Sequence, residues 1–121
     1  MDSAAFEQLV VEALESLPAR FQAYLANVDI IIEQRPSRAQ RRALDLRPWQ
    51  SVYGMYEGVP LTERGGGTLA PPDTIIIFQA PLERDFRSPA TLRDEVRRTV
   101  LHEIAHVFGI SDERLRELGA Y

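Results

Sequence analysis

The sequence predicts a single α+β domain, because helical and strand patterns follow one another along 121 residues. Two segments, 4–16 and about 88–108, repeat apolar residues at the helical spacing of three and four. Two others, 27–33 and 74–79, are β-branched, apolar runs that favour strands. A chain of this length can bury one modest core, so residues 1–121 are expected to form one domain.

The first half of the chain predicts two helices followed by two strands. Segment 4–16 is amphipathic, and Pro18 suits the first turn of a second helix that reaches about Leu25. Segment 27–33 is expected to be a buried strand. Residues 35–47 are rich in Arg and Ala and predict a solvated loop or a short helix. Segment 51–58 predicts a second strand, weakened by its two glycines.

The second half predicts one strand, one long helix and one short helix. A glycine loop at 64–68 and the two prolines at 71–72 precede the strand at 74–79. Its consecutive apolar residues indicate cover on both faces, or an edge position with one face packed. The long helix starts either at Ser88-Pro89 or at a capping box from Thr91, and Gly109 is suited to end it. A short helix is expected at about 112–118.

Composition narrows the classes of function. The net charge of -4 gives no electrostatic reason to expect nucleic acid or an anionic membrane as a partner. All 14 cations are arginines, but interspersed acidic residues disfavour phosphate recognition. Without cysteine, a transition-metal site must use His, Asp, Glu and water. The N-terminus does not resemble a signal peptide and no apolar run approaches a membrane span, so a cytoplasmic protein is expected.

The only two histidines of the chain stand in the sequence His102-Glu103-Ile104-Ala105-His106. Residues four apart lie on one face of a helix, so both imidazoles can hold one metal ion while Glu103 projects beside them. This H-E-x-x-H spacing is typical of zinc metalloproteases, in which the glutamate is the general base. The alternative is an ordinary pair of surface or core histidines.

A catalytic zinc ion usually takes a third protein ligand, which here must be a carboxylate. Asp112 lies six residues after His106, with Gly109 between them to turn the chain. Glu113 and Glu117 are the other candidates. The alternative for Asp112 is that it stabilises the first turn of a helix by capping or through the helix dipole. Iron, cobalt or nickel also suits such nitrogen and oxygen ligands, so zinc is an inference from ligand type.

Stabilising the oxyanion of a peptidase reaction needs a further donor. Residue type alone makes Tyr53, Tyr56 and Tyr121 candidates, although each is better explained as a packed aromatic residue.

Three segments, 53–61, 73–78 and 102–113, resemble the small bacterial zincin-like metallopeptidase domain family. The resemblance implies a compact zincin-like domain, with a small mixed sheet backed by helices and a C-terminal HExxH helix beneath a cleft. By analogy with zincins, a sheet edge above the cleft would bind an extended peptide. The 73–79 strand is the candidate for that edge, and the alternative is that it is a central core strand. The chain has no methionine after Gly109, so it departs from the metzincin pattern.

The motif and the resemblance predict a zinc-dependent metallopeptidase that hydrolyses peptide bonds by zinc-activated water, with Glu103 as general base. His102, His106 and Asp112 would hold Zn²⁺, and a peptide or protein segment would be the substrate. An alternative is a metal-containing regulatory or peptide-binding module with little proteolytic activity. A purely structural metal would need two carboxylates to close the site.

Overall fold

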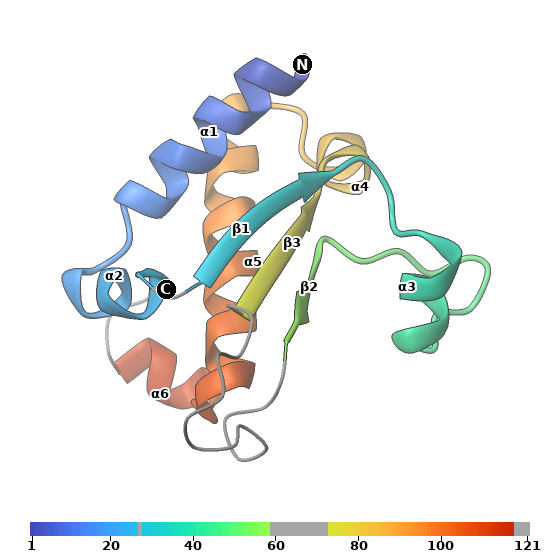
Figure 1. Ribbon diagram of the computed structural model, residues 1–121. Helices are drawn as coiled ribbons and strands as arrows, with labels where there is room; N and C mark the ends of the chain where they lie inside the picture. The colour runs from blue at the N-terminus through green and yellow to red at the C-terminus, as the bar shows by residue number, and fades with distance from the viewer. Residues whose placement is uncertain (27, 59–72, 118–121) are drawn as a thin grey trace.

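The computed structural model describes residues 1–26, 28–58 and 73–117 (Figure 1). They form a three-stranded mixed sheet with helices around it, which confirms the predicted α+β class. In chain order the elements are α1 (Ser3–Glu15), α2 (Ala19–Leu25), β1 (Val28–Glu33), α3 (Arg38–Ala43), β2 (Gly54–Glu57), β3 (Asp73–Phe78), α4 (Gln79–Asp85), α5 (Pro89–Phe108) and α6 (Asp112–Glu117).

The sheet has the order β1-β3-β2, so β3 is its central strand. β1 runs parallel to β3, with Val28 opposite Asp73, while β2 runs antiparallel, with Gly54 opposite Ile77. The consecutive apolar residues of β3 are therefore explained by cover on both faces. The expectation of a buried first strand was wrong: β1 is an edge strand on which Asp29 and Ile31 are exposed.

The larger core lies between one face of the sheet and the helices α1 and α5, which lie against each other (Figure 1). Ile75 and Ile77 of β3 point into it, because alternate strand residues share a face. Phe6 of α1 and Val100 of α5 are completely buried there. On the opposite face of the sheet, Ile76 and Phe78 form a smaller cluster with Met55.

One short helix was not predicted, and another confirms the helical alternative for the arginine-rich segment. The short helix α4 begins directly after β3 and had no sequence prediction, since it has seven residues, no side-chain cap and a proline at position 81. Residues 38–43 of the arginine-rich segment form α3, which begins at a capping box between Ser37 and Gln40. The predicted loop at 64–68 lies outside the described residues. No helix in the described part of the chain is long and apolar enough to cross a membrane.

Candidate metal centre

The helix that carries the motif, α5, begins and ends at residues suited to those positions. Ser88 is its N-cap, with Oγ accepting a hydrogen bond of 3.2 Å from the Thr91 N–H, and Pro89 opens the first turn. The alternative start at Thr91 is therefore wrong. Gly109 ends the helix in the left-handed conformation (φ 67°) and donates its N–H to the Ala105 carbonyl, as predicted.

The motif lies at the border between the buried and the exposed face of α5. His102 and Glu103 are half-buried and His106 is exposed, while Ile104 and Ala105 are buried in the larger core. The helix thus packs inward through one stripe and keeps both histidines on an adjacent, more accessible face.

Burial raises the pKa of the Glu103 carboxyl above its ordinary value, and the nearby His106 and His102 oppose that shift. A partly desolvated carboxylate holds a proton more strongly than one in water. Glu103 therefore has the electrostatic character expected of a group that accepts a proton during a reaction.

The segment after Gly109 contains the three carboxylates that are candidates for the third metal ligand. Ser111 caps α6, because its Oγ accepts a hydrogen bond of 3.1 Å from the Arg114 N–H. Glu117 is exposed and pairs with Arg114 at 2.9 Å, and Glu113 is also exposed. Asp112 is the first residue of α6, but its side chain lies outside the described part. Among described side chains, no three His, Asp or Glu residues are close enough to hold a metal ion.

Strand β2 lies directly against α5, one turn before the motif. A Cβ atom added to Gly54 would lie 2.7 Å from Thr99 Cγ2 and 2.9 Å from the Ile76 carbonyl oxygen, so only glycine fits there without movement. Thr99 precedes His102 by three residues and Glu103 by four, which places all three on neighbouring positions of the helix surface. β2 pairs with β3 along one edge, and no other described strand pairs with its outer edge.

Tyr56 and Asp73 form a partly buried hydrogen bond beside this contact. The Tyr56 hydroxyl donates to Asp73 Oδ1 at 2.6 Å, and Asp73 is only 4% exposed. A Cβ atom at Gly58 would lie 2.7 Å from each of these oxygens. Tyr56 shares a sheet face with Gly54, so this pair lies on the α5 side of β2 and β3. Sequence reasoning assigned no role to Asp73 or Gly54, because a lone Asp or Gly at a strand end carries no spacing signal.

Of the other candidate tyrosines, Tyr53 already donates its hydroxyl hydrogen to a partner within the protein. Its hydroxyl donates to Asp85 Oδ2 at 2.6 Å, and Asp85 is also paired with Arg84. The hydrogen bond to Asp85 and burial raise the pKa of Tyr53 to about 12, while Arg84 and Tyr53 lower the pKa of Asp85 to about 2. Tyr121 lies outside the described residues.

The Tyr53–Asp85 pair predicts an alkaline loss of stability. Because the folded pKa of Tyr53 exceeds its ordinary value of 10.0, its contribution is fully present below pH 10 and disappears as pH rises toward 12. Tyr53→Phe should flatten the fall in unfolding free energy across that interval in urea titrations. Tyr24→Phe, which leaves the Asp85 hydrogen bond in place, is the control. An equal fall in the wild type and Tyr53→Phe would contradict the assignment.

The family model of the zincin-like metallopeptidases matches residues 25–120, a range that contains the motif helix and all three strands. The chain belongs to the zincin-like metallopeptidase family. A solved structure of a conserved hypothetical protein from Thermo thermophilus shares the fold of this zincin-like protein, with a TM-score of 0.58 at 20% identity over 89% of this chain and 94% of that one. No curated protein matches the sequence.

The donor atoms of this zincin-like chain suit the zinc ion that its family implies. His102 and His106 offer two imidazoles on one side of α5, and the neighbouring carboxylate of Glu103 is partly desolvated. Zinc accepts nitrogen and carboxylate ligands, and a site with few protein ligands leaves room for water.

Proposed function

We propose that this protein is a zinc-dependent peptidase. The observation that carries the proposal is the placement of His102, Glu103 and His106 on one well-bounded helix, with the Glu103 carboxyl partly desolvated. Membership of the zincin-like metallopeptidase family supports the same reaction class.

In this proposal His102 and His106 would hold the zinc ion, which would act as a Lewis acid toward water and the peptide carbonyl. Glu103 takes the proton of the attacking water and returns it to the leaving amine. Its raised pKa favours the first transfer, because a more basic carboxylate accepts the proton of the attacking water more readily.

We propose that the substrate is an extended peptide or protein segment that pairs with the outer edge of β2. The 73–79 strand was expected to be either this edge or a central core strand, and β3 is central, because it is paired on both sides. β2 instead has one edge without a described strand partner and contacts α5 at Thr99, next to the motif. Main-chain hydrogen bonds along such an edge bind extended peptides with little dependence on sequence.

Asp112 is the proposed third zinc ligand. Glu117 is engaged with Arg114, and neither Glu113 nor Glu117 forms a described three-residue group with the histidines. Asp112→Ala should therefore weaken zinc binding by about 10- to 100-fold or more, while Glu113→Ala and Glu117→Ala leave it near the wild-type value. Calorimetric titration of the metal-free variants with zinc measures this. If Glu113→Ala or Glu117→Ala causes the larger loss, the ligand is that residue and not Asp112.

The experiment that tests the function is incubation of the zinc-loaded protein with a mixed peptide library, followed by mass spectrometry of the products. Cleavage that stops on chelation and returns with zinc is the expected result. Stoichiometric zinc without any cleavage would instead favour a regulatory or peptide-binding module.

A further inference from the structure

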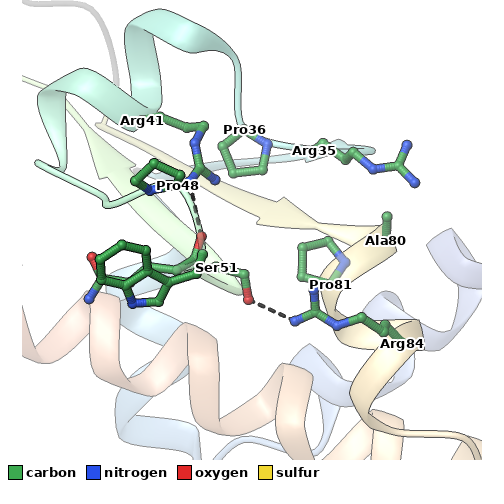
Figure 2. A pocket seen from close by; sticks show the side chains of 10 residues that line it. Arg35, Pro36, Arg41, Pro48, Ser51, Ala80, Pro81 and Arg84 are labelled. Atoms are coloured by element: carbon green, nitrogen blue, oxygen red, sulfur yellow. Dashed lines mark hydrogen bonds between the residues drawn. The ribbon is translucent and has the colours of Figure 1, made fainter.

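A pocket lies where the two parallel strands end, and no residue of the motif helix α5 lines it. β1 ends at Glu33 and β3 at Phe78, and the residues that follow them line a cavity of about 450 Å³ together with α3 and the turn at 48–51 (Figure 2). The carboxyl ends of parallel strands are a common place for ligands in α/β proteins. The volume is within the range of about 300–1,000 Å³ that small-molecule sites occupy.

Two arginines from different elements are fixed at this pocket. Arg41 of α3 donates from Nη2 to the carbonyl oxygens of Arg47 at 2.8 Å and Gln50 at 3.1 Å. Arg84 of α4 donates to Ser51 Oγ at 2.8 Å and to both oxygens of Asp85. Figure 2 shows Arg41 and Arg84 approaching the cavity from opposite sides, while the Arg35 side chain extends outward from its rim. These bonds use Nε and Nη2, so the Nη1 groups of both arginines can donate to a ligand.

Three arginines line the cavity although the chain as a whole is acidic, and one of them, Arg84, is paired with Asp85. Segment 35–47 contains five arginines and only one acidic residue, Asp45. Among the described residues that line the cavity, none is a carboxylate. Several guanidinium groups around one cavity suit an anion with more than one negative charge and several oxygens, since each planar fork can bind two oxygens. A phosphate group meets that description better than a single carboxylate does.

The pocket also carries a flat aromatic surface. Trp49, the only tryptophan of the chain, lines the cavity and is 76% exposed. The Arg47 guanidinium carbon lies 5.8 Å from the centre of its ring, which orients the ring by a cation–π contact. An exposed indole beside arginines offers a stacking surface for a planar ring.

We propose that this pocket binds a phosphorylated ligand that carries a flat ring, of the chemical class of the nucleoside monophosphates. Arg41 and Arg84 bind the phosphate, Arg35 adds charge at the rim, and the ring of the ligand stacks on Trp49. The site is separate from the proposed peptidase centre, so either assignment can fail without the other.

Trp49 is the only tryptophan of the chain, so the tryptophan emission of the intact protein reports on this pocket. Titration with adenosine monophosphate is expected to give a saturable change in emission. Arg84→Gln should weaken binding by about tenfold or more, the loss expected for a charge-assisted hydrogen bond, and Arg35→Gln should weaken it by a smaller factor, because Arg35 only adds charge at the rim. Arg38→Gln changes an exposed arginine of α3 that does not line the pocket and should bind as the wild type does.

Two further ligands test the phosphate contacts and the ring stacking separately. Thermal melts verify that each variant is folded. Inorganic phosphate and adenosine, measured by calorimetry, should both bind at least about tenfold more weakly than the monophosphate. The proposal is overturned by the absence of a saturable signal, by an equal loss in Arg38→Gln, or by adenosine binding as tightly as the monophosphate. Single-stranded RNA binding more than tenfold tighter than the monophosphate would also overturn it, in favour of a nucleic-acid partner.

Discussion

Replacing Glu103 with glutamine is expected to lower kcat/KM for peptide hydrolysis by about 10²- to 10⁴-fold, while zinc binding stays at the wild-type level. The amide keeps the size of the side chain but cannot accept the proton of the attacking water. Because Glu103 is already partly desolvated and has a raised pKa, loss of its charge should not unfold α5. Product formation from a peptide found in the library screen, together with elemental analysis, measures both effects.

Glu95→Gln is the matched control for this variant. Glu95 is a half-buried glutamate on the same helix, two turns before Glu103, and pairs with Arg98 at 3.1 Å. Its replacement should leave hydrolysis near the wild-type rate. Cleavage retained by Glu103→Gln would show that this carboxylate is not the general base.

The second large effect is expected at Gly54. A Cβ atom there would lie 2.7 Å from Thr99 Cγ2 and 2.9 Å from the Ile76 carbonyl oxygen, both closer than real Cβ contacts. Gly54→Ala should therefore lower the free energy of unfolding by about 1–3 kcal/mol, because β2 or α5 must shift to accept the methyl group. The same shift moves β2 relative to the motif, so we expect hydrolysis to fall as well. Urea unfolding followed by circular dichroism measures the stability loss.

Thr99→Ser separates the two contacts, because serine lacks the Cγ2 atom that Gly54→Ala would press against. The double variant should recover part of the lost stability but not all of it, since the Ile76 carbonyl remains in place. Gly54→Ala with wild-type stability, or losses in the two single variants that simply add, would argue against close packing of β2 on α5.

Local signals in the sequence were sufficient to predict α5. Ser88 with Pro89 was one of two predicted starts, and Gly109 was the predicted end. Each acts on backbone groups within a few residues. Helical geometry alone places His102 and His106 on one face of α5, with Glu103 beside them. These features required no knowledge of how distant segments meet.

The arrangement of distant segments was not predictable in the same way. The apolar runs of β1 and β3 look alike, yet one is an edge strand and the other is central, because sheet order depends on contacts between residues far apart in the sequence. The close approach of Gly54 to Thr99 is of the same kind. Arg35 and Arg41 belong to a segment that was predicted to be solvated. They line a pocket only because α4 and the turn at 48–51 pack near them.

The central claim is that His102 and His106 hold a zinc ion, and the zinc content of the purified protein tests it most directly. After exposure to zinc and dialysis, the wild type should retain about one zinc per chain, while His102→Ala and His106→Ala should retain almost none. Circular dichroism would verify that both variants remain folded. A wild type that retains no zinc, or variants that retain as much as the wild type, would contradict the account.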